Sequence, residues 1–318
     1  MRIVFLGTGG SFPTKERNVG SVALQVGGDI ILFDCGEGTQ RQLLYTTLSF
    51  MKIKRIYISH LHGDHFFGLP GLVQTMGMNQ RKYPLEILGP QESGPHLQRI
   101  LDAGFGFNPF EIRVRELADW HTETEGELTI TNCQVNHTVP SLAIAVQEKD
   151  KRGKFDREKA VELGVPPGPL FSKLTNGRTV EVDGRTIEPD QVMGPPRKGK
   201  KFVYCGDTAP CDSIREIAKD ADVLVYESTF AHELEEKAKD FMHSTNVQAA
   251  QVAKECNVKH LILNHISPRY SGEDVQNMLE DCRKVHPETH IASDLDDLVL
   301  TAEGLKESRE KEQDHRPG

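Results

Sequence analysis

This chain of 318 residues has no long apolar run and no closely spaced pair of cysteines. No segment approaches the roughly 18 consecutive apolar residues that a membrane-spanning helix needs. At the N-terminus only four apolar residues lie between Arg2 and Gly7, which is too few for a secretory signal peptide. The sequence therefore predicts a protein without a membrane segment and with a cytoplasmic location.

Six cysteines are scattered along the chain, and no two have C-x-x-C spacing. In a chain without an export signal we expect them to be reduced and packed as small apolar side chains. Basic residues are also fewer than acidic ones, and the net charge is −9. This balance excludes an evenly basic nucleic-acid-binding surface but leaves room for a local basic patch.

What the sequence does contain is an alternation of strand-like and helix-like segments. Short apolar runs that end in polar loops predict strands at residues 2–7, 21–26, 29–34, 55–60, 85–89, 128–135, 201–207, 222–229 and 260–267. Helical patterns lie between them, at residues 39–48, 68–78, 95–104, 213–221, 247–256 and 273–285. Two similar halves of this kind predict an α/β layered sandwich with the sheets inside and the helices outside.

Residues 148–201 break this pattern, and we expect them to form an insertion within a single domain that spans residues 1–318. The segment contains thirteen Lys/Arg and nine Asp/Glu, so its charge is +4 and that of the remaining chain is −13. Its GVPPGPL stretch, residues 164–170, is too rich in proline and glycine for the interior of a helix or strand. The charged tail after Leu305 is expected to lie in solvent and to fray.

The stretch SHLHGDH, residues 59–65, carries the strongest chemical signal because it places four potential metal ligands within six residues. In an extended segment His60 and His62 point the same way and can bind one ion. The turn that follows lets Asp64 and His65 face a second ion. Imidazole and carboxylate together suit zinc.

Two ions need about seven or eight protein ligands, so further ligands are expected at the ends of other strands. His137, Asp207 and His265 each lie at or near the end of a predicted strand. Asp207 has two carboxylate oxygens and is suited to bridge both ions. The predicted metal ligands are therefore His60, His62, Asp64, His65, His137, Asp207 and His265.

This ligand set resembles that of the metallo-β-lactamase superfamily. The resemblance is carried by SHLHGDH, His137, the GDT triplet at Asp207 and the NHIS stretch at His265, and it covers nearly the whole chain. It implies a four-layer αβ/βα sandwich with two metal ions at the edges of the sheets. Because this superfamily hydrolyses lactams, thioesters and phosphodiesters, the substrate has to be inferred from other residues.

Further stretches resemble the ribonuclease Z family of tRNA 3′-processing endonucleases. FPTKERN at residues 12–18 matches the family's P-x-K-x-R-N loop, FMHSTN at 241–246 contains an HST triplet, and GVPPGPL lies in the insertion. YESTF at 226–230 corresponds to the family's H-E-A-T-F and departs from it at Tyr226 and Ser228.

The resemblance implies a mechanism and a set of contact residues. With two zinc ions per subunit, water is activated to attack the scissile phosphorus, and Asp64 orients this water and can take its proton. His243, kept charged by Glu227, gives a proton to the leaving ribose 3′-oxygen. The cut follows the discriminator base of a precursor tRNA and leaves a 3′-hydroxyl. The residues expected to contact the RNA are Lys15, Arg17, Asn18, Gly168, Pro169 and Arg269.

The resemblance also assigns a purpose to the insertion, as an extended arm that grips the tRNA body away from the cut. Pro166, Pro167, Gly168 and Pro169 would form its stiff bend, and lysines and arginines flank it on both sides. Concentrating phosphate contacts on such an arm reconciles an acidic chain with an RNA substrate. A homodimer is implied, in which the arm of each subunit holds a tRNA that is cut in the partner's site.

Two other functions stay open on the sequence alone. A hydrolase of a small substrate, such as a cyclic nucleotide, an aryl sulfate or a lactam, would use the same metal site but would leave the basic insertion without a purpose. A non-catalytic RNA-binding module would be expected to have lost ligands, whereas every proposed ligand is present. At the HST triplet, helix capping by Ser244, Thr245 or Asn246 is an alternative to catalysis that can also coexist with it.

Overall fold

The computed structural model describes residues 1–103 and 109–308, which form two compact units. The larger unit consists of Met1–Thr124, Ile130–Val146 and Lys201–Gly318, and the smaller one of Glu125–Thr129 and Gln147–Lys200. Gly104, at the end of a predicted helix, and residues 309–318 of the predicted tail lie outside the described residues.

Two mixed β-sheets run through the larger unit. The first has the strand order β17-β16-β1-β2-β3-β4-β5-β6. Its strands are β1 (Arg2–Gly7), β2 (Ser21–Val26), β3 (Asp29–Phe33), β4 (Ile53–Tyr57), β5 (Leu85–Pro90), β6 (Ile112–Leu117), β16 (Asp297–Thr301) and β17 (Gly304–Glu307). The second has the order β15-β14-β13-β12-β9-β8-β7. Its strands are β7 (Thr122–Glu125), β8 (Leu128–Val135), β9 (Ser141–Glu148), β12 (Lys201–Cys205), β13 (Val223–Glu227), β14 (His260–Asn264) and β15 (Thr289–Ile291).

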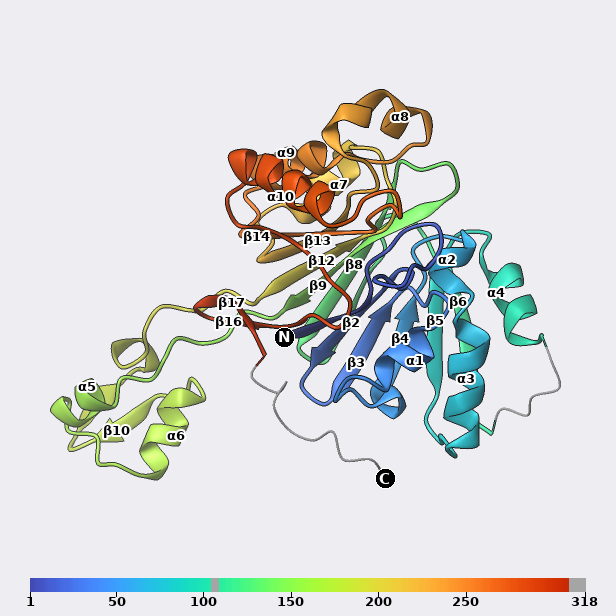
Figure 1. Cartoon of the computed structure of the whole chain (residues 1–318). Coiled ribbons are helices and arrows are strands. Elements are labelled where there is room, and N and C mark those ends of the chain that lie inside the picture. The colour runs from blue at the N-terminus through green and yellow to red at the C-terminus, as the bar shows by residue number, and fades with distance from the viewer. Residues whose placement is uncertain (104–108, 309–318) are drawn as a thin grey trace. The chain divides into compact units, whose positions relative to one another are not determined.

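Helices cover the outer face of each sheet (Figure 1). The first sheet carries α1 (Thr39–Leu43), α2 (Gly63–Phe66), α3 (Leu69–Met78), α4 (Gly94–Leu101) and the 3₁₀ turn η1 (Phe50–Lys52). The second carries α7 (Asp212–Ala218), η3 (His232–Leu234), α8 (Glu235–Asp240), α9 (Asn246–Glu255) and α10 (Glu273–Val285). The predicted four-layer αβ/βα sandwich is therefore confirmed, and no described helix has the length and apolar character needed to cross a bilayer.

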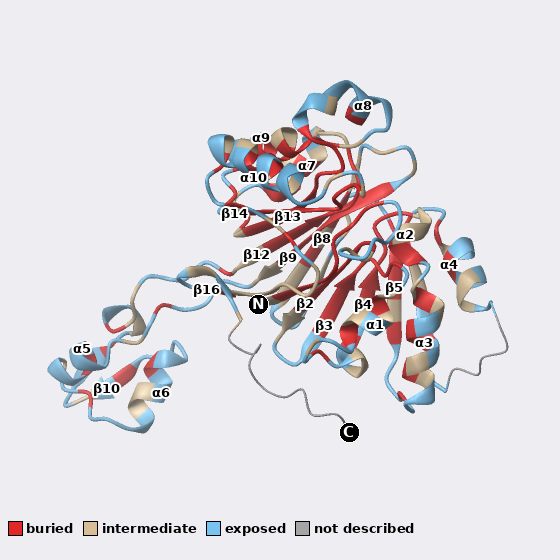
Figure 2. Cartoon of the chain, in the orientation of Figure 1, coloured by how far each residue is buried: buried red, intermediate tan, exposed pale blue. Residues whose placement is uncertain are grey.

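The central strands of each sheet are buried on both faces and are the most deeply buried part of the larger unit (Figure 2). Between the sheets, Phe33 of β3 packs against Phe202 and Tyr204 of β12, with ring centroids 5.4 and 5.1 Å apart. Aromatic pairs at this spacing are held by packing as well as by burial. This contact fixes the two sheets against each other, so that polar loops at their ends are brought together.

Several sequence-based boundaries are wrong. The helix predicted to run to residue 48 ends at Leu43, and Leu44 and Tyr45 after it are exposed. The strands β6, β7, β9, β10, β11, β15, β16 and β17 were not predicted, because most of them are short or partly exposed and lack a clear apolar run. The start of the tail does not fray, since Lys306 and Glu307 pair with β16. Five of the six cysteines are buried and all six are unpaired, as predicted.

The smaller unit is a folded module with its own apolar cluster. It contains α5 (Arg157–Glu162), α6 (Pro169–Thr175), the hairpin β10 (Val180–Val182) with β11 (Arg185–Ile187), and the 3₁₀ turn η2 (Pro189–Gln191). Its buried residues are Ala160, Val165, Leu174, Val180, Ile187 and Val192. Two chain segments lead to this module side by side, joined by the bridges Lys151↔Arg197 and Phe155↔Met193.

The GVPPGPL stretch joins α5 to α6. Gly164 and Gly168 have φ angles of +86° and +146°, which side chains with a Cβ rarely adopt. Pro169 is the first residue of α6, where its missing N–H leaves no hydrogen bond unmade. The expectation that residues 164–170 exclude helix is therefore wrong for the last two of them.

Candidate active site

One group of potential metal ligands consists of His60, His62, His137 and Asp207. His60 and His62 lie in the loop between β4 and α2, while the other two follow β8 and β12. The Nε2 atom of His60 lies 3.0 Å from Nδ1 of His62, and Nε2 of His137 lies 3.3 Å from that same Nδ1. Two ligands about 2.0–2.1 Å from a tetrahedral ion are about 3.3 Å apart, so these nitrogens are spaced for a shared cation.

A second group consists of Asp64, His65 and His265, and Asp207 lies between the two groups. The Nε2 atoms of His65 and His265 are 3.2 Å apart, and Nε2 of His265 is 3.3 Å from Oδ2 of Asp64. Oδ2 of Asp207 lies 3.3 Å from Nε2 of His265, 3.5 Å from that of His65 and 3.7 Å from that of His60. The structure thus brings all seven predicted ligands together, with Asp207 in the position between the groups.

Four of the five imidazoles use their second ring nitrogen in a hydrogen bond. His60 Nδ1 contacts Ser59 Oγ at 3.0 Å, and His137 Nδ1 contacts the carbonyl of Met242 at 2.9 Å. His265 Nδ1 contacts Thr229 Oγ1 at 2.8 Å. Bonds of this kind orient the ring and direct the other nitrogen at a metal. The donor set and its orientation therefore fit a zinc site.

Asp34 is a buried site residue that sequence reasoning missed. Its carboxylate contacts Nδ1 of His65 at 2.7 Å and accepts hydrogen bonds from the backbone N–H and the hydroxyl of Ser59 and from the hydroxyl of Tyr204. It therefore holds both His65 and the loop that begins the ligand stretch. Like Asp207, it is an acid that directly follows an apolar strand, and this signal was available in the sequence.

The charges of the site favour a bound cation. Burial lowers the pKa of His60, His62 and His137, so these rings are neutral and available as ligands. Burial would raise the pKa of Asp207, but the facing His265 and His65 rings lower it well below its usual range. Burial would lower the pKa of His65 as well, but Asp207, Asp34 and Asp64 raise it well above its usual value, so a protonated His65 balances the buried carboxylate, a role that a bound cation would take over.

His243 and Glu227 form a pair next to the ligand groups. Nδ1 of His243 is 2.7 Å from Oε1 of Glu227 and 3.9 Å from Oδ2 of Asp207. Burial alone would lower the pKa of His243, but the Glu227 carboxylate outweighs it and raises the pKa to about 9. Because Nδ1 faces Glu227, Nε2 is the nitrogen that can reach a substrate.

Glu227 is itself held by four further donors. Oε1 accepts from the backbone N–H groups of Thr208 and Ser244, and Oε2 accepts from the N–H and the hydroxyl of Thr229. The same Thr229 hydroxyl contacts His265, so one side chain connects the acid–histidine pair to a potential metal ligand. At Tyr226, where the sequence departs from the family pattern, the phenol is buried and contacts Ser244 Oγ at 3.3 Å.

The structure confirms helix capping, one of the two roles considered for the HST triplet. Thr245 is the N-cap of α9. Its hydroxyl accepts a hydrogen bond from the backbone N–H of Gln248, and the side-chain oxygen of Gln248 accepts one from the backbone N–H of Thr245. This capping box fixes the start of the helix. His243 lies two residues before it, so the cap fixes the backbone from which the histidine extends.

The two basic residues of the loop between β1 and β2 differ in how far they are buried. Lys15 is exposed, whereas Arg17 is half-buried and donates through Nη1 to Thr8 Oγ1 and to the carbonyl of Ala292, each at 2.6 Å. The backbone N–H of Asn18 donates to Asp294, at 2.7 Å. Arg17 and Asn18 thus anchor the loop in the fold.

The remaining predicted contact residues lie apart in the chain. Arg269 is exposed, with its guanidinium 4.9 Å from the ring centre of Phe230 and Nε donating to Ser267 Oγ. Gly168 and Pro169 belong to the smaller unit and are exposed.

Comparison with known proteins places this site in context. The family model described as anti-Pycsar protein Apyc1 matches residues 1–147, and the beta-lactamase superfamily domain matches residues 188–266. Ribonuclease Z of Methanosarcina acetivorans is 45% identical over 301 residues, which are 94% of this chain and 98% of that protein. Ribonuclease Z of Bacillus licheniformis is 42% identical over 298 residues, which are 92% and 97% of the two chains. The crystal structure of human tRNase Z, short form, superposes with a TM-score of 0.69 at 27% identity and covers 95% of this chain and 100% of its own.

Proposed function

Because the chain belongs to the ribonuclease Z family, as its 45% identity to an archaeal member shows, we propose that it is a zinc-dependent endoribonuclease that removes the 3′ trailer from precursor tRNA. The cut follows the discriminator base and leaves a 3′-hydroxyl on the tRNA. The observation that carries this proposal is the set of seven convergent ligands beside the buried pair of His243 and Glu227. Since the substrate is a newly made tRNA, we place the enzyme in the cytoplasm.

Two Zn²⁺ ions are the cofactor that this ligand set fits. His60, His62 and His137 would hold one, Asp64, His65 and His265 the other, and Asp207 both. When bound, such ions lower the pKa of water from 15.7 towards about 7 and neutralise negative charge on phosphate oxygens.

Asp64 orients the attacking water and takes its proton. Its Oδ2 already accepts a hydrogen bond of 2.7 Å from the backbone N–H of Ser11, which fixes the direction of the carboxylate. Ser11 has a φ angle of +68°, so the loop after β1 adopts an unusual backbone conformation to make this contact.

His243 donates the proton that the ribose 3′-oxygen needs as it leaves. The hydrogen bond from Nδ1 to Glu227 stabilises the charged ring and leaves Nε2 for the leaving oxygen. The four other donors to Glu227 hold that carboxylate in place. This arrangement is suited to general acid catalysis, in which the acid must be protonated before the bond breaks.

The loop after β1 contributes to recognition of the acceptor end of the tRNA. Lys15 is free to contact a phosphate, and Arg17 and Asn18 hold the loop through Thr8, Ala292 and Asp294. Arg269 adds a second exposed cation on the loop after β14. Backbone contacts of this kind position an RNA without reading its sequence.

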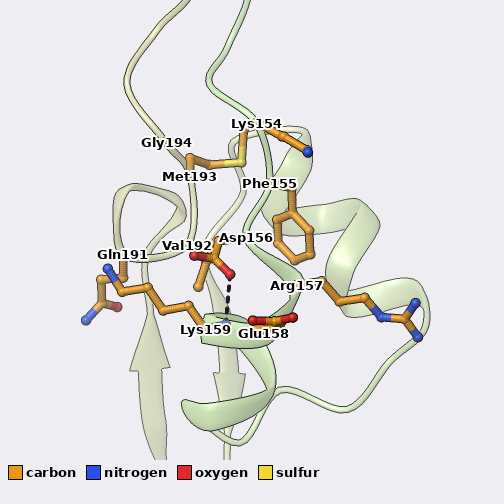
Figure 3. Close-up of a pocket in the computed structure, with 10 residues that line it drawn as sticks. All are labelled: Lys154, Phe155, Asp156, Arg157, Glu158, Lys159, Gln191, Val192, Met193 and Gly194. Atoms are coloured by element: carbon orange, nitrogen blue, oxygen red, sulfur yellow. Dashed lines mark hydrogen bonds between the residues drawn. The ribbon is translucent and has the colours of Figure 1, made fainter.

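The smaller unit acts as the arm that binds the tRNA body. Lys154, Arg157 and Lys159 line a cavity of about 540 Å³ together with Phe155 and the segment 191–194 (Figure 3). Of the two acids in the same wall, Asp156 accepts the backbone N–H of Lys159 as the cap of α5, and Glu158 is exposed. Exposed cations around a concave apolar surface suit a phosphate backbone. Gly168 and Pro169 start α6 in the same unit and are the other contacts we assign to it.

We also propose a homodimer in which the arm of one subunit delivers tRNA to the active site of the other. Leu44 and Tyr45, directly after α1, and Phe67, directly after α2, are 68%, 56% and 58% exposed. Leu44 and Phe67 line one cavity of about 410 Å³. Large apolar side chains gathered on one surface are typical of a protein contact site.

The experiment that tests the function is to map the cut in a 3′-extended precursor tRNA. The zinc-loaded protein is incubated with precursor tRNA and, in parallel, with bis(p-nitrophenyl) phosphate. We expect a single cut after the discriminator base, a 3′-hydroxyl on the tRNA, and only slow turnover of the small diester. Cleavage of the small diester alone would instead favour a hydrolase of small substrates.

A further inference from the structure

A third group of potential metal-binding side chains lies at the opposite end of strand β14 from the active site. It consists of His260, Glu288 and His290, whose potential ligand atoms all lie within 4.8 Å of one another. His260 is the first residue of β14, whereas the active-site ligand His265 follows its last. Five residues of strand span about 16 Å, so the two sites are separate.

The pairing of β14 with β15 explains why these three residues meet. The strands are parallel, with Leu261 opposite Thr289 and Ile262 opposite His290. His260 is therefore level with Glu288, and the backbone N–H of Leu261 donates to the carbonyl of Glu288 at 3.0 Å. Side chains two residues apart on a strand point to the same face, so Glu288 and His290 share a face. His260 is level with Glu288 on the neighbouring strand, and its side chain therefore lies on that face as well.

His260 presents an unused nitrogen to this group. Its Nδ1 atom is buried and has no hydrogen-bond partner among the described residues, although buried polar atoms are nearly always paired. The other nitrogen faces the hairpin of β16 and β17, where a Cβ at Gly304 would lie 3.4 Å from Nε2. Nδ1 is therefore the nitrogen that is left for a ligand.

The spacing of the group matches that of the active site. Nδ1 of His260 lies 3.8 Å from Oε2 of Glu288. In the active site, Nε2 of His60 lies 3.7 Å from Oδ2 of Asp207, and Nε2 of His65 lies 3.6 Å from Oδ2 of Asp64. A movement of a few tenths of an ångström would bring such pairs to the separation of two ligands on one tetrahedral ion. Glu288 and His290 are exposed, so an ion can enter from solvent.

We propose that His260, Glu288 and His290 form a further binding site for a divalent transition ion, with Zn²⁺ as the ion that this donor set suits. Two imidazoles and one carboxylate are a common zinc ligand set, with water completing the coordination. The ion joins the start of β14 to β15, which has only three residues and forms the edge of its sheet. Its role is to hold this short edge strand in register.

The test is the number of zinc ions that the full-length protein binds. Wild type, His290→Ala and the matched surface variant His96→Ala are equilibrated at a series of free Zn²⁺ concentrations and analysed for metal by mass spectrometry. His290 and His96 are both exposed, so neither replacement disturbs the core. We expect His290→Ala to bind one ion fewer than the other two proteins, and Glu288→Gln to weaken binding of that ion at least about tenfold.

Thermal unfolding provides a second measurement. Zn²⁺ added beyond the ions of the active site is expected to raise the Tm of wild type and of His96→Ala, because an ion that binds only the folded state stabilises it. His290→Ala is expected to lack this rise. Equal zinc content and an equal rise in Tm for all three proteins would overturn the proposal.

Discussion

The active site and the smaller unit hold their functional side chains in opposite ways. In the active site, the histidines and carboxylates lie at or just after the ends of buried strands, in the short helix α2 or just before α9, and most have a second partner that fixes their direction. In the smaller unit, a few apolar residues form a small cluster and the charged side chains extend into solvent. The first arrangement suits chemistry, which needs fixed distances, and the second suits a long, flexible polyanion.

With the function proposed above, the difference implies that this chain separates cleavage from substrate capture. Asp207 and Glu227 are almost fully buried, and each is bonded on several sides. Lys154 and Arg157 in the smaller unit are exposed. Changes in the active site should therefore act on kcat, and changes in the smaller unit on KM.

The largest effect is expected from His243→Ala. Loss of the general acid should lower kcat on precursor tRNA by about 10²–10⁴-fold. The loss should be far smaller on bis(p-nitrophenyl) phosphate, because p-nitrophenolate leaves without needing a proton. Zinc content should stay the same. The matched control is His232→Ala, an exposed histidine on η3.

The measurement compares kcat on both substrates with zinc per chain. An equal loss on the two substrates would show that His243 acts through the metal site rather than as an acid. Full activity on precursor tRNA would remove it from the mechanism altogether.

A moderate effect is expected when the smaller unit is removed. The backbone N–H of Glu148 donates to the carbonyl of Lys200 at 2.9 Å, so two glycines can replace residues 149–199 without straining the ends. KM for precursor tRNA should rise by roughly 10–100-fold because phosphate contacts are lost. Turnover of bis(p-nitrophenyl) phosphate should stay unchanged.

A variant that removes only part of the positive charge of the smaller unit tests the same comparison more finely. Changing Lys151, Arg152 and Lys154 to Gln keeps the apolar cluster of the smaller unit and removes three positive charges. It should reduce the dependence of KM on salt, whereas a change in kcat on the small diester would show that the two regions are not separate. If neither variant affected the processing of precursor tRNA, the smaller unit would serve only as a linker.

The smallest effect is the recovery of activity on mixing the two damaged proteins. His243→Ala retains the smaller unit, and the deletion variant retains the active site. If the arm works across a homodimer, random exchange gives half mixed dimers with one productive site each, and about a quarter of wild-type activity. Light scattering checks that the mass is that of a dimer. Activity no higher than the sum of the separate proteins would exclude delivery between subunits.

Much of the active site was predictable because its signals are local. The ligand stretch at residues 59–65 is contiguous, and His137, Asp207 and His265 each follow an apolar run. Asp34 was missed although it also ends such a run, because a lone acid in sequence does not show what it contacts. Thr229 was missed as well, since its role depends on lying between Glu227 and His265.

The sequence by itself determined most of the elements of the larger unit, the layered α/β class and the candidate ligands, because apolar periodicity and metal-ligand chemistry are properties of short segments. Only the tertiary structure decided which candidate ligands lie together, that Arg17 points into the fold, and that residues 147–200 form a module with its own core. The third group of His260, Glu288 and His290 also depends on strand register. These features rest on contacts between residues far apart in the chain, which strand pairing and packing bring together.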